Sequence, residues 1–226
     1  MKILVRAIGA LAAVMFLLAV VAIFKSLTSP KPKQEIPLDL HMPALAITFA
    51  PFNKVESFLG SADVRNQIRQ GLSGDYVFIA MYWLLFVGMS ALLAKRSHAG
   101  AVWAGVVAAA FATSAAIFDV VENLRTAALL NAVKIQPELV DRIAWAGFGK
   151  WLLISLSTLV LSLVFVRRDW LILLASLYAL IGVTCIYGLL LRQPRFVELS
   201  FGLNLVGLPV VGIFFSGWPQ KLLDQL

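Results

Sequence analysis

The chain has 226 residues, of which 61% are hydrophobic and only 14% are charged. A soluble domain carries about 25% charged residues, so this composition indicates a protein that uses a lipid bilayer as its solvent. The formal net charge of +7 does not indicate nucleic-acid binding, because most basic residues flank apolar stretches and form no stripe interleaved with aromatic residues. The single cysteine, Cys185, excludes an internal disulfide.

The first apolar stretch, residues 7–24, follows Lys2 and Arg6 and has features of both a signal peptide and a membrane span. It is longer than the apolar region of a typical signal peptide, which has about 7–15 residues. The nearest small-x-small site, Ser26-Leu27-Thr28, is a poor cleavage site. We therefore expect residues 1–25 to form an uncleaved N-terminal anchor rather than a signal.

The next segment, residues 26–74, is more polar and begins with a Pro-rich linker at residues 29–33. After the apolar residues 43–50, apolar side chains recur at helical spacing between charged ones. They are Phe52, Val55, Phe58 and Leu59, followed by Val64, Ile68 and Leu72. We expect short amphipathic helices that lie on the membrane surface and cover the bundle, with a loosely ordered loop as the alternative.

Five further apolar stretches each predict a spanning helix, because about 20 apolar residues are needed to cross the hydrocarbon layer. They are residues 76–94, 101–130, 143–166, 170–191 and 197–218. Asp75 opens the first of them, and Pro209 predicts a kink in the last. The predicted fold is an all-α polytopic transmembrane helix bundle of six spans with an extracytoplasmic amphipathic cap. Residues 75–226 would supply five of these spans.

The distribution of Lys and Arg predicts the orientation of the bundle. With the N-terminus in the cytoplasm, the cytoplasmic basic residues would be Lys2, Arg6, Lys95, Arg96, Arg167, Arg168 and Lys221. The short loops on the opposite side would carry Arg125, Lys134, Arg142, Arg192 and Arg195. This difference favours a multi-pass membrane protein with both termini cytoplasmic.

An acidic and amide cluster interrupts the stretch of residues 101–130. Asp119, Glu122 and Asn123 stand at positions i, i+3 and i+4, which places all three on one face of a helix. The same face carries small residues toward its N-terminal end, namely Ala108, Ala112 and Ala116. Small residues at this spacing allow a second helix to approach closely, so the polar face is expected to point into the bundle.

Lys150 is the expected partner of this cluster. A charged side chain near the centre of a spanning helix costs roughly 2.5–3.5 kcal/mol on insertion scales, so Lys150 should pair with Asp119 or Glu122. The predicted topology brings further polar residues to the same half of the membrane. The candidates for the polar centre are Asp75, Tyr82, Asp119, Glu122, Asn123 and Lys150, and the secondary candidates are Arg125, Arg192, Arg195 and Glu198.

Several of these residues stand in an order that resembles a broad group of small bacterial multi-span membrane proteins to which no activity is assigned. The likeness covers residues 43–166 and rests on residues 49–58, Asp75-Tyr76-Val77-Phe78-Ile79 with Tyr82, Asp119-x-x-Glu122-Asn123 and Lys150-Trp151. The resemblance implies a shared polar centre at Asp75, Tyr82, Asp119, Glu122, Asn123 and Lys150, and it implies no particular activity. The anchor and the last two spans lie outside it.

The sequence offers little for metal or nucleophilic chemistry. His41 and His98 would lie on opposite sides of the membrane, far from Cys185, so no metal site is expected. No Gly-x-Ser-x-Gly motif or phosphate-binding glycine loop is present, and no cofactor is expected. The hydroxyl residues of the fourth span are expected to bond to the backbone or between helices. They are Ser155, Ser157, Thr158 and Ser162.

Three functional hypotheses follow from the polar centre. In the first, it fixes the register of neighbouring spans in a non-catalytic accessory protein that binds a membrane lipid, a membrane protein partner or a second copy of the chain. In the second, it serves a small proton- or cation-coupled carrier. In the third, it serves an intramembrane enzyme acting on a lipid headgroup, with Arg125 or Lys150 as an anion clamp.

Overall fold

The computed structural model describes residues 2–28, 36–40, 42–95, 99–163 and 171–217, and all regular structure in these ranges is helical. The helices are α1 (Lys2–Thr28), the 3-10 helix η1 (Pro37–Asp39), α2 (Pro43–Phe49), α3 (Phe52–Leu59), α4 (Ala62–Ala94), α5 (Ala99–Asn131), α6 (Pro137–Ser162), α7 (Leu171–Leu190) and α8 (Pro194–Gly217). The prediction of an all-α fold is therefore confirmed. The linker at residues 29–33, His41, His98, Arg167, Arg168 and Lys221 lie outside the described residues.

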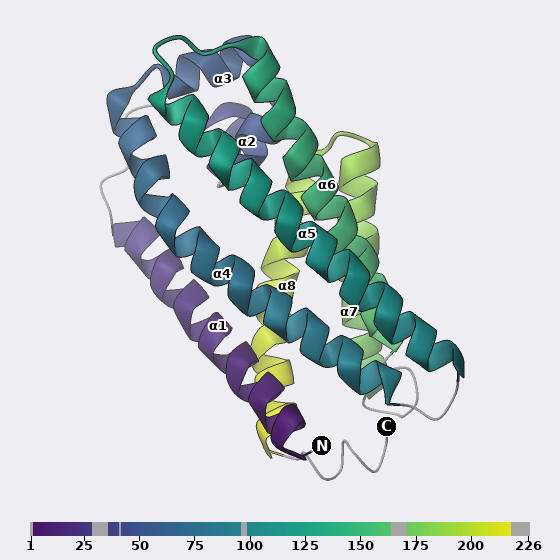
Figure 1. Cartoon of the computed structure of the whole chain (residues 1–226). Coiled ribbons are helices and arrows are strands. Elements are labelled where there is room, and N and C mark those ends of the chain that lie inside the picture. Colours follow the sequence, from purple (N-terminus) through teal and green to yellow (C-terminus); the bar gives the residue numbers. More distant parts are fainter. Residues whose placement is uncertain (1, 29–35, 41, 96–98, 164–170, 218–226) are drawn as a thin grey trace.

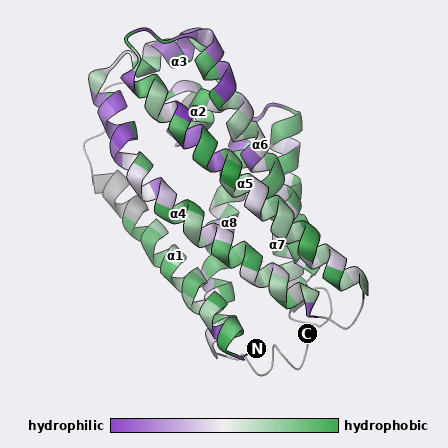
Figure 2. Ribbon diagram, in the orientation of Figure 1, coloured by the Kyte–Doolittle hydropathy of each residue, from purple (hydrophilic) through white to green (hydrophobic). Residues whose placement is uncertain are grey.

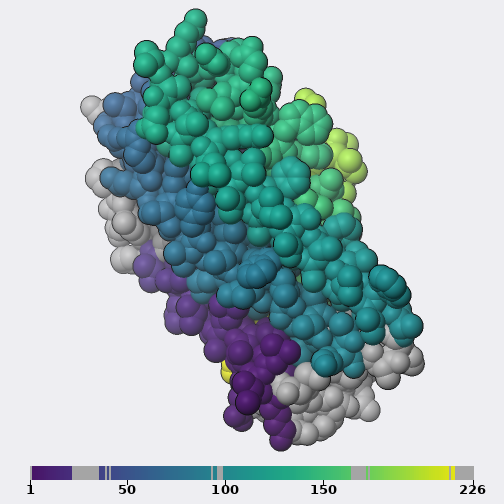
Figure 3. Space-filling view, viewed as in Figure 1, coloured from purple at the N-terminus to yellow at the C-terminus, as the bar shows by residue number. Residues whose placement is uncertain are grey.

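In the described part of the chain, six long helices form an elongated bundle (Figure 1). Successive helices from α4 to α8 pack side by side, and α1 packs against both α8 and α4. Helix α1 begins and α8 ends at the same end of the bundle, whereas α2 and α3 lie at the opposite end. Helices α4 and α5 run along the near face of the molecule in the space-filling view (Figure 3).

Five of these helices, α1, α4, α5, α6 and α8, are long and apolar enough to cross a membrane. Helix α7 has a shorter described apolar stretch, Leu174–Leu190, but its 20 residues rise about 30 Å, which matches the hydrocarbon thickness. Large apolar side chains such as Trp103, Ile117 and Leu190 point outward and are more than half exposed. Hydrophilic residues gather around α3 and the start of α4 (Figure 2). The chain is a multi-pass membrane protein.

Helix α4 differs from the prediction. The amphipathic turns around Val64, Ile68 and Leu72 were expected to end before Asp75, but α4 runs unbroken from Ala62 to Ala94. A helical glycine costs only about 1 kcal/mol relative to alanine, so Gly71 and Gly74 do not break the helix. Packing offsets this cost, because these apolar side chains contact a cluster that includes Leu129 and Leu130 of α5.

The cap at the end of the bundle is formed by α2 and α3. Helix α3 has the expected amphipathic character, with Val55, Phe58 and Leu59 buried between exposed polar residues. Helix α2 is more deeply placed than a helix lying on a surface, since it packs against α6 and α8 and buries Leu45 and Ile47. Its Met42 N–H, at the N-cap, donates to Glu198 Oε1 at 3.0 Å. The α2 side of the cap therefore packs between helices of the bundle.

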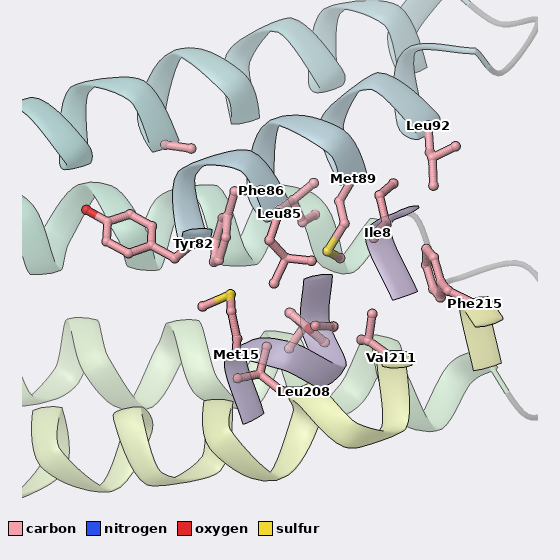
Figure 4. Packing of buried hydrophobic residues seen from close by; sticks show 14 of the residues in the cluster. Ile8, Met15, Tyr82, Leu85, Phe86, Met89, Leu92, Leu208, Val211 and Phe215 are labelled. Atoms are coloured by element: carbon pink, nitrogen blue, oxygen red, sulfur yellow. The ribbon is translucent and has the colours of Figure 1, made fainter. Parts of the chain in front are cut away.

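Among the described residues, one apolar cluster draws buried side chains from α1, α4, α5, α6, α7 and α8. Ile8 and Met15 of α1 meet Leu85 and Met89 of α4 and Phe215 of α8 (Figure 4). Tyr82 stands at the edge of this cluster, and its hydroxyl points away from the other labelled side chains. The ring of Tyr82 thus belongs to the apolar core, whereas its hydroxyl is directed elsewhere. Helix α8 continues through Pro209 as a single helix.

Candidate functional site: a buried ion-pair centre

The polar face of α5 is buried inside the bundle, as its spacing predicts. Asp119, Glu122 and Asn123 are exposed by only 4%, 2% and 5%. The small residues Ala108 and Ala112, which precede them on the same helix, are also buried, so that α4 and α6 pack directly against α5. The three polar side chains therefore lie at the contact of three spanning helices.

Lys150 of α6 meets both acids. Its Nζ lies 3.0 Å from Asp119 Oδ1 and 2.6 Å from Glu122 Oε2. The contact with Asp119 is an aligned hydrogen bond, whereas the shorter contact with Glu122 is an ion pair without hydrogen-bond alignment. The Trp151 ring lies below the ammonium, with its centroid 5.2 Å from Nζ, close enough for a cation–π contribution. The predicted pairing of Lys150 is thus present and involves both carboxylates.

Helix α4 contributes two further contacts. The Tyr82 hydroxyl donates to Asp119 Oδ2 at 3.1 Å, so the Asp119 carboxylate is held on one oxygen by Lys150 and on the other by Tyr82. One turn further along α5, Asn123 Nδ2 donates to Asp75 Oδ2 at 2.7 Å. The six residues named from the sequence as the polar centre therefore form two bonded groups where α4, α5 and α6 meet, and we call them together the ion-pair centre. One group is Tyr82, Asp119, Lys150 and Glu122, and the other is the pair of Asp75 and Asn123.

The immediate surroundings of Glu122 include two residues that sequence reasoning missed. Gly147 lies one turn before Lys150 on the same face of α6, and Thr48 of α2 packs against it. A methyl group at Gly147 would lie 2.5 Å from Thr48 Oγ1 and 3.4 Å from Glu122 Oε1. Thr48 is itself held, because its hydroxyl donates to Ala44 O at 2.9 Å. The i, i+3 spacing from Lys150 was the available signal for Gly147, whereas nothing local indicated Thr48.

The secondary candidates have separate roles in the structure. Arg125, considered as an anion clamp, donates instead to Arg142 O at 2.6 Å and so ties α5 to α6. Glu198 accepts from the backbone at the start of α2. Arg195 is exposed in the first turn of α8. Arg192 lies in the turn between α7 and α8, where it lines a groove described below.

The hydroxyl residues of α6 bond as predicted. Ser155 donates to Trp151 O, Thr158 donates to Ile154 O and Ser162 donates to Leu159 O, each within α6. Ser157 instead donates across to Ala108 O of α5 at 2.9 Å. The hydroxyls therefore satisfy backbone carbonyls, one of them between helices.

The chemistry of the ion-pair centre is that of a closed electrostatic contact. Asp119 accepts from Tyr82, and Glu122 lies against the Lys150 ammonium. The side-chain amide of Asn123 donates to Asp75. Within the described residues, no group of three or more His, Cys, Asp or Glu side chains could hold a metal ion.

Comparison of the chain with family models, curated proteins and solved structures finds no match. The class defined by fold and site is a multi-pass α-helical membrane protein with a buried ion-pair centre.

Proposed function

We propose that the chain is a non-catalytic accessory protein of the bacterial inner membrane that binds a membrane lipid or a partner membrane protein. In this protein the ion-pair centre fixes the register of α4, α5 and α6. The observation that carries the proposal is the double engagement of Lys150 by Asp119 and Glu122. Separating these helices would be costly, because it would leave charges unpaired at this depth.

The distribution of basic residues supports an orientation with both ends of the chain in the cytoplasm. Lys2 and Arg6 lie in the first turns of α1, and Lys95 directly follows α4, which ends at the same end of the bundle (Figure 1). The positive-inside rule assigns such a basic end to the cytoplasm. The cap of α2 and α3 would then face the other side of the membrane.

The test of the structural role compares Lys150→Met with the triple variant Asp119→Asn/Glu122→Gln/Lys150→Met. The single substitution leaves two buried carboxylates without their cation, so we expect it to lower stability by on the order of 3 kcal/mol. The triple variant carries none of these charges and should be more stable than the single one. Folded yield and thermal unfolding in detergent measure both.

Lys134→Met, in the exposed loop between α5 and α6, is the matched control for loss of a lysine. It should leave folded yield and thermal unfolding unchanged. A Lys150→Met protein that unfolds at the wild-type temperature would contradict the proposal, and so would a triple variant no more stable than the single one.

A second candidate, a proton-coupled carrier, is favoured by one specific observation. Two acids face a single ammonium, so the formal charges of Asp119, Glu122 and Lys150 sum to −1 unless one carboxyl group holds a proton. Proteoliposomes that contain a pH-sensitive dye distinguish the two functions. A carrier would show proton flux that Glu122→Gln abolishes, whereas the accessory protein would match empty liposomes.

A further inference from the structure

A groove of about 510 Å³ lies beside α6, between the first half of this helix and the segment that joins α2 to α3. One wall is the segment of residues 47–52, the other is formed by Val140, Asp141, Ala144, Trp145 and Phe148 of α6, and Arg192 completes the lining. The groove is separate from the ion-pair centre, although Thr48 lines it and also packs against Gly147 beside Glu122. Its volume lies in the range of pockets that hold small ligands, roughly 300–1,000 Å³.

The walls of the groove are mainly apolar and aromatic. Phe49 and Phe52 come from the α2–α3 side, and Trp145 and Phe148 from α6, where their rings meet edge to face at 6.4 Å. Trp145 is 74% exposed on the outside of a spanning helix, so this side of the groove faces the bilayer. Exposed tryptophan near the end of a span is typical of the membrane interface. The walls therefore suit a hydrocarbon chain that enters from the membrane.

Two charged side chains of opposite sign line the same groove. Asp141 lies in the second turn of α6, and Arg192 lies in the turn between α7 and α8. Both are exposed, and among the described residues neither forms an ion pair within the protein. The groove thus offers one cation and one anion to a ligand, next to an apolar wall.

The backbone at Arg192 is fixed by a helix cap. Gln193 N–H donates to Gly188 O at 2.7 Å and Arg192 N–H donates to Leu189 O at 3.2 Å, which is the Schellman pattern at the end of α7. Arg192 has a φ of 52°, in the left-handed conformation that such a cap requires and that glycine usually supplies. The position of the Arg192 Cα at the groove is therefore set by the end of α7.

We propose that this groove binds a zwitterionic phospholipid with a primary ammonium headgroup. One acyl chain lies along the aromatic walls, the phosphate binds the Arg192 guanidinium and the ammonium binds the Asp141 carboxylate. Arginine matches phosphate oxygens with two parallel donors, and an ethanolamine-type ammonium can donate to a carboxylate whereas choline cannot. This inference rests on the proposed binding role and names the lipid as the ligand.

The experiment uses the purified full chain, delipidated in detergent and then mixed with phosphatidylethanolamine, phosphatidylglycerol or phosphatidylcholine. Native mass spectrometry measures the lipid that each protein retains. The unmodified chain should retain phosphatidylethanolamine best. Arg192→Gln should reduce its retention roughly tenfold, equivalent to about 1.4 kcal/mol. Asp141→Asn should make the retention of phosphatidylethanolamine equal to that of phosphatidylcholine. Both lipids should still be retained through their phosphate groups.

A second variant tests the apolar wall by a different route. Ala144→Phe fills the groove and leaves both charges in place, so it should also reduce retention of all three lipids. Lys134→Gln is the control, an exposed lysine outside the groove, and should behave like the unmodified chain. Equal retention by the unmodified chain and by Arg192→Gln would overturn the proposal, as would stronger retention of phosphatidylglycerol than of phosphatidylethanolamine.

Failure of this inference can be distinguished from failure of the proposed function. None of the bonds of the ion-pair centre involves Arg192, Asp141 or Ala144. Variants at these three positions should therefore unfold at the temperature of the unmodified chain. A change in lipid preference at an unchanged unfolding temperature reports on the groove and not on the ion-pair centre. A wild-type unfolding temperature in Lys150→Met reports on the ion-pair centre and not on the groove.

Discussion

Lys150 joins α6 to α5 through contacts with two acids. A single ammonium bridges two acids that stand three residues apart on α5, so sliding α6 by one residue, about 1.5 Å, would break at least one of the two contacts. The Tyr82 hydroxyl extends the same constraint to α4 through the second oxygen of Asp119. These contacts link α4, α5 and α6 through polar side chains, as the proposed role in helix register requires.

Gly147 provides a prediction at the same scale. In Gly147→Ala the new methyl group would meet Thr48 Oγ1 and Glu122 Oε1, and Thr48 cannot turn away without losing its bond to Ala44 O. We expect a loss of stability of about 1–3 kcal/mol, the usual cost of overpacking. Thermal unfolding in detergent, followed by circular dichroism, measures this loss.

Gly74→Ala is the matched control for that substitution. Gly74 also lies within a helix, but a methyl group there would meet no atom within 4 Å. It should therefore raise stability by about 0.5–1 kcal/mol, because alanine is the better helix former. Equal effects of the two alanines would show that Gly147 is not closely packed between α2 and α5.

At the scale of elements, Arg65 and Arg69 of α4 bind the ends of neighbouring helices, and Arg65 joins the cap to the bundle. The Arg65 guanidinium donates from Nε to Leu59 O at the end of α3 and from Nη1 to Ala132 O beyond the end of α5. Arg69 donates to Leu130 O and to Asn131 Oδ1 at 3.0 Å. The last carbonyls of a helix have no partner within it and carry partial negative charge, so these cations stabilise the ends of α3 and α5.

We therefore expect Arg65→Met to lower stability by about 1–2 kcal/mol, since the substitution removes two charge-assisted bonds to helix ends while keeping the length of the side chain. Lys54→Met, on the exposed face of α3, removes a cation from the same cap without such bonds. Limited proteolysis and thermal unfolding should show a looser cap in Arg65→Met only. A matching change in Lys54→Met would assign the effect to net charge.

At the scale of the whole molecule, the arrangement of the helices determines which described segments share an end of the bundle. Helix α1 begins and α8 ends at one end of the bundle, and the loop between α5 and α6 lies at the other end with the cap (Figure 1). Any orientation in the membrane must therefore place the start of α1 and the loop residue Val133 on opposite sides.

Cysteine labelling tests the proposed orientation. The native Cys185 is only 2% exposed and should not react, so cysteines introduced at exposed positions report on their own location. With both ends cytoplasmic, a membrane-impermeant maleimide should label Val133→Cys in intact cells and Lys2→Cys only after permeabilisation. The reversed pattern would invert the orientation, and labelling of both variants in intact cells would contradict the topology.

The sequence by itself determined the properties that depend on neighbouring residues. Apolar stretches of sufficient length predicted the spanning helices, and the i, i+3, i+4 spacing placed Asp119, Glu122 and Asn123 on one buried face. The cost of an isolated charge at membrane depth predicted a partner for Lys150. These inferences succeed because hydrophobicity and helical periodicity are local, and because a buried charge requires a partner whatever the fold.

Only the tertiary structure decided which remote segments meet. It joined both acids to Lys150, carried α4 through Gly71 and Gly74 in one helix, and brought Thr48 of α2 against Gly147 of α6. It also formed the groove at Arg192 from three separate segments. Spacing along one helix fixes only the direction in which a side chain points, whereas the distance between two helices depends on how all of them pack together.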